Sequence, residues 1–169
     1  MFGLFKKKKT QEEVKENSGL NLVAICDGTV KPLSEVPDPV FSQKMAGDGV
    51  AIEPTSDIIV APADGELSLV FNTKHAFAMT LDNGIELLVH VGLETVSLNG
   101  EGFEQLAEAG QKIKAGTPIL KIDREFIKSK GLPLITPVLI TNPDSTKSIS
   151  GKEGVTTTAG STVILEYTV

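Results

Sequence analysis

Two histidines occur in this sequence, and the residues between them read as a β-hairpin. His75 leads into a β-prone stretch, residues 76–81, and His90 falls near the end of the apolar run 85–91. Asp82-Asn83-Gly84 separates the two stretches, and Asn-Gly between such runs is a strong turn signal. An imidazole is a nucleophile near neutral pH and a common metal ligand. Two of them in one hairpin therefore indicate a reactive or metal-binding site.

The length of the turn decides how the two histidines face each other. Asn-Gly favours a two-residue type I′ turn, because both central residues need positive φ. That register pairs Phe77 with His90 and puts His75 on the same sheet face, one diagonal step away, with backbones about 7–8 Å apart. A four-residue loop would place the histidines directly opposite each other, and a three-residue loop would send them to opposite faces. We take the two-residue turn and predict both imidazoles on one face.

The composition is that of a soluble globular domain with an acidic body. The 169 residues are 40% hydrophobic and 22% charged, which suits one domain with a sizeable core. The formal net charge is −6, and removing Lys6–Lys9 from the 16 basic residues leaves 12 against 22 acidic ones, or −10. Phosphate binding needs a basic surface, so no nucleic acid partner is expected. Cys26 is the only cysteine, which predicts a small buried hydrophobe, no intramolecular disulfide and a reducing, cytoplasmic compartment.

The N-terminus carries an apolar segment, Met1–Phe5, followed by four lysines, which is the reverse of the order in a signal peptide. We divide the chain into a flexible amphipathic tail, residues 1–18, and a single domain, residues 19–169. The tail is either solvated or a weak anchor to an anionic membrane surface. No apolar segment of the sequence is long enough to span a bilayer.

Past the tail, short β-prone runs alternate with turns rich in Gly, Pro, Asn and Asp. Two segments favour helix, Gly102–Gly110 and Arg124–Lys130. The pattern as a whole predicts an all-β fold, a compact antiparallel β-sandwich or flattened barrel of short strands with one or two short helical turns. The expected strands are 20–26, 28–33, 49–53, 58–61, 66–71, 76–81, 85–91, 117–122, 135–141, 154–157 and 161–168.

The segment around His90 resembles a known signature. Residues Gly84–Val96 fit the phosphorylation-site pattern of the glucose-family enzyme IIA of the bacterial phosphoenolpyruvate-dependent sugar phosphotransferase system. In that pattern, His-apolar-Gly-apolar-any-Thr-apolar follows a glycine and an apolar run. Further segments that resemble the family are 37–41, 47–52, 61–65 and 71–77. The resemblance implies an antiparallel β-sandwich. It also implies a phosphoryl relay from the histidine-phosphorylated carrier HPr, through this protein, to the IIB domain of a sugar permease.

The resemblance also implies roles for individual residues. His90 is the phosphoacceptor, which would carry the phosphate covalently without any cofactor, and His75 stabilises the phosphoryl group. Thr73 precedes His75 by two residues, so on an extended chain it shares a face with His75 and can hold its far nitrogen. By the same resemblance, the backbone carbonyl of Gly92 orients the other nitrogen of His90.

An apolar surface is expected around the reactive histidine. Alternation puts Leu88 beside His90 on one strand face, with Phe77 and Met79 on that face across the hairpin. Such a surround excludes water from a hydrolysable phosphohistidine and offers a docking patch. The opposite, core face of the same strand is expected to carry Ile85, Leu87, Val89 and Val91. By the resemblance, the partner-binding patch comprises Val40, Phe41, Met45, Ala46, Phe71, Leu88 and Val96, with the charged residues Asp38 and Glu94.

Two other functions stay open from the sequence. A zinc hydrolase needs three protein ligands plus water, and the chain has no third histidine, although a carboxylate could complete a site. We expect no required metal, with adventitious or partner-shared zinc at His75 and His90 as the remaining metal contact. A swinging-arm module of the biotinyl or lipoyl kind needs a modified lysine at a hairpin tip, and Lys44-Met45 is only half of such a motif.

Overall fold

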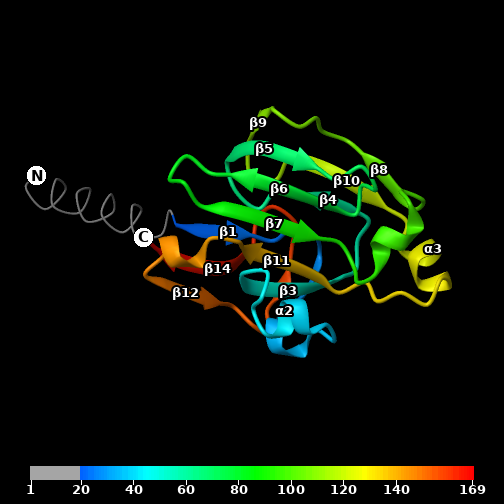
Figure 1. Cartoon of the computed structure of the whole chain (residues 1–169), viewed down its shortest axis with the longest axis horizontal. Helices are drawn as coiled ribbons and strands as arrows, with labels where there is room; N and C mark the ends of the chain where they lie inside the picture. Colours follow the sequence, from blue (N-terminus) through cyan, green and yellow to red (C-terminus); the bar gives the residue numbers. More distant parts are fainter. Residues whose placement is uncertain (1–19) are drawn as a thin grey trace, which may run out of the picture.

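The computed structural model of this protein describes residues 20–169 (Figure 1), so the predicted tail, residues 1–18, lies outside the described residues. The described chain forms, in order, β1 (Asn21–Val23), β2 (Gly28–Pro32), the 3-10 helix η1 (Leu33–Glu35), α2 (Pro39–Ser42), β3 (Asp48–Pro54), β4 (Ile58–Val60), β5 (Gly65–Val70), β6 (Ala76–Thr80), β7 (Glu86–His90), η2 (Thr95–Leu98), β8 (Phe103–Gln105), β9 (Lys112–Ile113), β10 (Pro118–Ile122), α3 (Arg124–Ser129), β11 (Thr136–Ile140), η3 (Pro143–Ser145), β12 (Ser148–Gly151), β13 (Thr156–Thr157) and β14 (Val163–Thr168).

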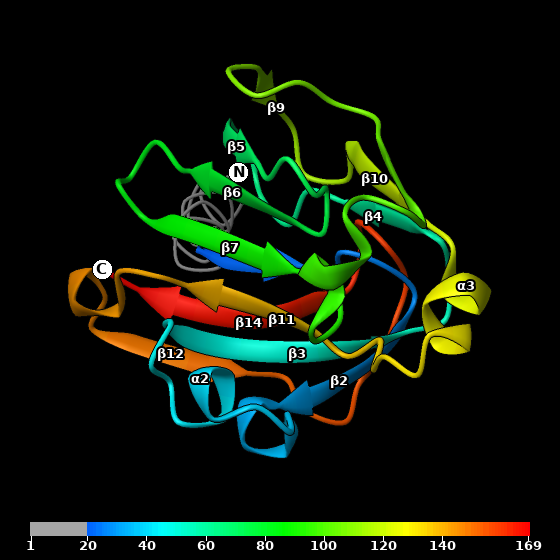
Figure 2. The ribbon, with the colours of Figure 1, turned by 45° about the vertical axis from the view of Figure 1, so that its right-hand side comes forward.

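The strands of residues 20–169 form three antiparallel sheets around one main core. The large sheet has eight strands in the order β13-β2-β3-β11-β7-β6-β5-β9, and β1-β14-β12 and β4-β10-β8 form two smaller sheets. Figure 2 shows β6, β7, β11 and β3 running side by side, with α2 next to β3 and α3 at one end of the molecule. Fully buried side chains from all three sheets, such as Leu22, Ile59 and Val89, belong to one hydrophobic cluster. The predicted all-β class is confirmed, as a curled sheet closed by smaller ones.

Each predicted strand run contains an observed strand, but the helix predicted at Gly102–Gly110 is wrong. Its first half forms β8, which pairs with β10. Phe103 is only 9% exposed, so burial of its side chain against the core outweighs the helical spacing of the segment. Both flanking glycines have positive φ, 86° and 94°, and therefore mark turns. Three short strands, β8, β9 and β12, fall outside the predicted runs.

The helix predicted at Arg124–Lys130 is confirmed as α3. The carboxylate of Asp123 accepts a hydrogen bond from the backbone N–H of Phe126 at 3.0 Å, which caps the helix. The short helix α2 was not predicted, although Asp38 caps it in the same way and is followed by a proline at the first helical position. No helix of residues 20–169 is long and apolar enough to cross a membrane.

The predicted register of the histidine hairpin is wrong by one residue. The structure pairs Ala76 with His90, so the loop has three residues, and Leu81 N–H bonds to the Ile85 carbonyl at 2.9 Å across it. A type I′ turn needs positive φ at both central residues. Among the loop residues 82–84 only Gly84 has positive φ, 87°, so the turn is not of this type. The amide of Asn83 is engaged elsewhere: it donates to the Tyr167 hydroxyl at 3.0 Å and accepts from Ile85 N–H at 3.1 Å.

The shifted register also moves two side chains to the other face. Phe77 and Met79 pair with Val89 and Leu87, and they are 0% and 1% exposed in the main core. The prediction that they lie beside His90 is therefore wrong. The predicted core face of β7 and its flanks is confirmed, because Ile85, Leu87, Val89 and Val91 are all buried.

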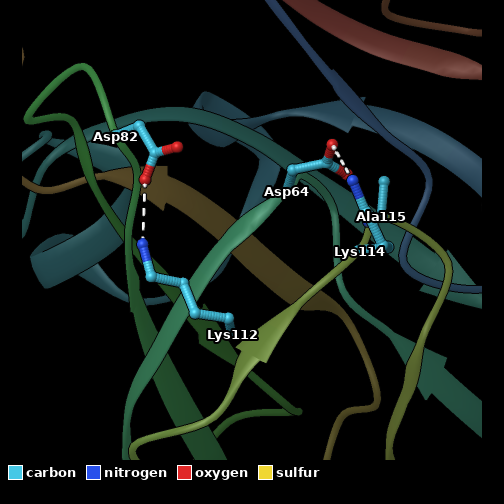
Figure 3. Close-up of polar contacts among 5 residues, drawn as sticks. All are labelled: Asp64, Asp82, Lys112, Lys114 and Ala115. Carbon is cyan, nitrogen blue, oxygen red and sulfur yellow. Dashed lines mark hydrogen bonds and ion pairs between the residues drawn. The ribbon is translucent and has the colours of Figure 1, made fainter.

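Two exposed aspartates bind the edge strand β9 and the residues after it to neighbouring parts of the large sheet (Figure 3). Lys112 Nζ lies 3.2 Å from a carboxylate oxygen of Asp82, and Lys114 Nζ lies 3.7 Å from Asp64. The backbone N–H of Ala115 also donates to Asp64 at 2.8 Å. Exposed ion pairs contribute little to stability, so the hydrogen bond from the Ala115 N–H to Asp64 is the stronger of these contacts.

Cys26 has the environment of a structural thiol. Its side chain is 0% exposed, and burial, with a smaller contribution from the charge of Asp27, raises the pKa of the thiol to about 12. The prediction of a small buried hydrophobe is confirmed.

Candidate functional site

The two imidazoles meet at one site although the hairpin register differs from the predicted one. The ring centroids of His75 and His90 lie 4.8 Å apart, and the ring planes are at 81°. His75 precedes β6 and follows Lys74, whose φ is 58°, so the alternation of a regular strand does not extend to it. Its carbonyl still accepts from Val91 N–H at 2.7 Å, which fixes the backbone beside the end of β7.

One nitrogen of His90 is anchored to the backbone. His90 Nδ1 lies 2.8 Å from the Gly92 carbonyl oxygen. A carbonyl can only accept, so the proton of the neutral ring belongs on Nδ1 in this contact. Nε2 is then left with its lone pair. The ring of Phe41 lies 5.1 Å away, centroid to centroid, and tilted by 54°.

His75 is held by two neighbours in the turn before β6. The Thr73 hydroxyl lies 2.6 Å from His75 Nδ1. If the hydroxyl donates there, the ring proton sits on Nε2, which makes that nitrogen a donor. Phe71 contacts the ring edge-on, with 5.4 Å between centroids and 75° between planes. The side chain of His75 is only 4% exposed.

The site keeps both imidazoles neutral near pH 7. Burial, with the nearby charge of His90 when that ring is protonated, lowers the pKa of His75 from 6.5 to about 4. Burial also lowers the pKa of His90, against the opposing effects of the Gly92 hydrogen bond and the negative charge of Asp38. A neutral imidazole has the free lone pair that nucleophilic attack requires.

The Gly92 position accepts only glycine without strain. Its φ is 73°, and a Cβ there would lie 2.7 Å from the Pro133 carbonyl oxygen and 2.8 Å from Thr95 Cγ2. The carbonyl that anchors His90 is thus set by a backbone conformation that side chains rarely adopt.

The predicted patch residues divide into buried and exposed members. Phe41 is 5% exposed, and Leu88 and Ala46 are partly buried against the same small cluster, made by Leu33, Val36, Phe41, Ala51, Leu93, Ile135 and Leu139. The exposed members are Val40 at 44%, Met45 at 70% and Val96 at 53%. Val40 and Met45 belong to α2 and the turn after it, whereas Val96 lies on η2.

The two acidic residues lie at element boundaries. Asp38 caps α2, and Glu94 precedes η2 with a φ of 61°. Within residues 20–169, neither carboxylate makes a hydrogen bond or ion pair to an imidazole, and Asp38 affects His90 through its charge.

A metal site at the two imidazoles lacks a third protein ligand within the described part of the chain. Among residues 20–169, no group of three or more His, Cys, Asp or Glu side chains lies where it could hold a metal ion. A zinc ion at His75 and His90 would therefore need further ligands from another molecule. Lys44, the residue considered for a swinging arm, sits between α2 and β3 and pairs with Asp48 at 3.4 Å, so it is not at a hairpin tip.

Two buried threonines of the site were not predicted. The Thr95 hydroxyl donates to the Val91 carbonyl at 2.6 Å, and the Thr136 hydroxyl accepts from Gly92 N–H at 3.4 Å. Thr95 could have been found, because a threonine occupies a fixed place in the signature around His90. Thr136 has no signal of this kind, since it comes from a distant strand.

Comparison with known proteins gives consistent matches. Residues 20–146 match the family described as phosphoenolpyruvate-dependent sugar phosphotransferase system, EIIA 1. The chain is 48% identical over 168 residues to the PTS system glucose-specific EIIA component of Bacillus anthracis, covering 99% of this chain and 96% of that protein. It is 50% identical over 138 residues to the PTS system glucose-specific EIIBCA component of Corynebacterium glutamicum, which covers 82% of this chain but 20% of the longer protein. The solved structure of glucose permease IIA from Mycoplasma capricolum matches with a TM-score of 0.81 and 39% identity, over 86% of this chain and 94% of that one.

Proposed function

The chain belongs to the EIIA family of the phosphoenolpyruvate-dependent sugar phosphotransferase system, and from that membership we propose that it is a phosphohistidine carrier. It accepts a phosphoryl group from HPr on His90 and passes it to the IIB domain of a sugar permease. The observation that carries this proposal is the hydrogen bond between His90 Nδ1 and the Gly92 carbonyl, because it leaves Nε2 as the free nucleophile beside His75.

In the proposed reaction, His90 Nε2 attacks the phosphorus of phospho-HPr. A new N–P bond forms on Nε2, the N–P bond of the donor breaks, and its electron pair returns to the donor imidazole. The proton stays on Nδ1 of His90, hydrogen-bonded to the Gly92 carbonyl, so His90 need not lose a proton during the transfer. The same steps run in reverse deliver the phosphoryl group to the IIB domain, and the covalent phosphate requires no cofactor.

His75 stabilises the phosphoryl group during transfer. Its ring is held by Thr73 on Nδ1, so that an N–H on Nε2 can donate to the phosphoryl oxygens where negative charge develops. Burial keeps His75 neutral at pH 7, which favours a hydrogen bond over a fixed ion pair. A fixed charge would hold the phosphoryl group more tightly and oppose its onward transfer.

The partners dock on the apolar surface around His90. The exposed side chains Val40, Met45 and Val96 provide contact area, while Phe41 and Leu88 line the surface beside the ring. Asp38 and Glu94 add negative charge at its edge, which steers a basic partner surface. The match to a glucose-specific EIIBCA component, in which an EIIA-like segment occurs in the same polypeptide as B and C parts, supports a IIB domain as acceptor.

The carrier works in the cytoplasm, at the inner face of the membrane that holds its permease. The amphipathic tail, residues 1–18, contributes weak contact with anionic lipids. Flotation of the full chain with anionic vesicles tests that contact. We expect the chain to float with the vesicles at low salt and to dissociate from them at high salt.

Incubation with phosphoenolpyruvate, enzyme I and HPr tests the proposed function. We expect one acid-labile phosphoryl group per chain, and none on His90→Ala. His75→Gln serves as the matched control, because it changes the neighbouring imidazole and keeps the acceptor. Stoichiometric labelling of His90→Ala would refute the assignment.

A further inference from the structure

Two threonine hydroxyls hold the peptide plane that follows Val91. The Thr95 hydroxyl donates to the Val91 carbonyl at 2.6 Å, and Gly92 N–H donates to the Thr136 hydroxyl at 3.4 Å, a long hydrogen bond. Carbonyl and N–H belong to the same planar amide. Opposite edges of this plane are therefore fixed by side chains from η2 and β11.

The next peptide plane is the one that anchors His90. The Gly92 carbonyl accepts from His90 Nδ1 at 2.8 Å, and the N–H of Leu93 in the same plane donates to the Pro133 carbonyl at 3.1 Å. The hydrogen bonds thus run in one line, from the Pro133 carbonyl through this amide to the imidazole. Bonds in such a chain polarise one another, which strengthens the acceptor that faces Nδ1.

Gly92 is the hinge between the two planes. Glycine has more backbone freedom than any other residue, and small rotations here would swing the second carbonyl away from His90. Both threonines are 0% exposed, and the Thr136 hydroxyl also donates to the Leu134 carbonyl at 2.8 Å, so its own orientation is set. The buried hydroxyls therefore fix the peptide plane on one side of Gly92, and the bond from Leu93 N–H to the Pro133 carbonyl fixes the plane on the other side.

We propose that Thr95 and Thr136 are positioning residues for the phosphoryl acceptor: their hydroxyls hold the Val91–Gly92 peptide so that the Gly92 carbonyl stays on Nδ1 of His90. The effect on phosphoryl uptake rests on the proposed function, because a proton on Nδ1 leaves Nε2 free to attack the phosphorus. The tautomer of a histidine is set by the hydrogen bond that its other nitrogen makes. Without the threonine contacts, the Gly92 carbonyl no longer favours the Nδ1–H tautomer of His90. The ring then also adopts the Nε2–H tautomer, in which the reacting nitrogen has no free lone pair.

The test compares valine and serine variants of the full chain. Thr95→Val and Thr136→Val keep the shape of the side chain and remove the hydroxyl, whereas Thr95→Ser keeps the hydroxyl. Thr157→Val is the matched control, because Thr157 is also a buried threonine whose hydroxyl donates to a backbone carbonyl, that of Cys26 at 2.9 Å. Two quantities are measured: the tautomer of His90, from long-range ¹⁵N–¹H spectra at neutral pH, and the rate of phosphoryl uptake from phospho-HPr.

Thr95→Val should move His90 toward the Nε2–H tautomer and slow uptake roughly 10-fold, as loss of a supporting hydrogen bond typically does. Thr136→Val should do the same to a smaller extent, since its bond to Gly92 is long. Thr95→Ser and Thr157→Val should resemble the wild type in both quantities.

A merely structural role would slow uptake without moving the tautomer, and that result would overturn the proposal. So would wild-type tautomer and rate in both valine variants. If Thr136→Val fails to fold, Thr95→Val and its serine partner still decide the question. If the wild type accepts no phosphoryl group while Thr95→Val shifts the tautomer, the proposed function fails and the positioning role stands.

Discussion

The imidazole of His75 lies edge-on to that of His90, with 4.8 Å between ring centroids and 81° between planes. Each ring uses Nδ1 for a contact two residues away in the chain, His75 with Thr73 and His90 with Gly92. The pair therefore has one nitrogen on each ring that is not used for anchoring. This arrangement suits a nucleophile with a hydrogen-bond donor beside it.

The first prediction separates acceptance of the phosphoryl group from its delivery. His75→Gln should still be labelled by phospho-HPr, because His90 keeps its anchor on Gly92. Transfer to a IIB domain should fall about 100-fold, the usual cost of one transition-state donor. Single-turnover transfer from the labelled variant measures this rate. Normal transfer would remove His75 from the mechanism.

The second prediction concerns acid stability. Burial and the nearby His90 hold the pKa of His75 at about 4 in the folded protein, below the ordinary 6.5. Between these values the unfolded chain binds a proton that the folded protein does not. The free energy of unfolding should therefore fall as pH drops from 6.5 toward 4, by at most about 3 kcal/mol from this group.

His75→Gln removes that titration and should flatten this part of the pH dependence. Urea unfolding of wild type and variant at neutral pH and near the lower pKa measures the difference. An unchanged pH dependence in the variant would show that His75 does not titrate as described.

The third prediction uses two glycines with similar backbone angles. Gly92 has a φ of 73° and no room for a Cβ, whereas Gly84 has a φ of 87° and nothing within 4 Å. Gly84→Ala should cost about 1 kcal/mol from backbone strain alone. Gly92→Ala should cost clearly more and also slow phosphoryl uptake, because the anchoring carbonyl must shift. Equal losses of stability, with uptake unchanged in both, would contradict this account.

The fourth prediction tests the docking surface with two exposed valines. Val96 is 53% exposed and belongs to the predicted patch, and Val155 is 37% exposed and does not. Val96→Asp should weaken the productive encounter with phospho-HPr roughly 10-fold, seen as a raised KM, because it adds an unpaired charge to a desolvated contact. Val155→Asp should leave the KM unchanged, and both variants should keep their stability within about 0.5 kcal/mol. A similar KM for both variants would show that phospho-HPr does not dock on the surface around Val96.

Part of the site could be predicted because its contacts are local in the chain. Thr73 and His75 are two residues apart, so their spacing already limits where the side chains can reach, and the family resemblance supplied the equally local contact of His90 with the Gly92 carbonyl. The strands were predictable for a related reason, since alternation of apolar residues reflects burial on one face. The helix predicted at Gly102–Gly110 failed because core burial of Phe103 competes with helical spacing.

What the sequence by itself determined is the strands other than β8, β9 and β12, the two imidazoles and the local partner of His75, with the partner of His90 supplied by the family resemblance. Only the tertiary structure decided the hairpin register, because the Asn83 amide is taken up by Tyr167, 84 residues away. It also decided that Phe41 packs against His90 and that Thr136 supports Gly92, 44 residues away. The physical reason is that such contacts form between strands far apart in the chain, and their register depends on packing that no local pattern records.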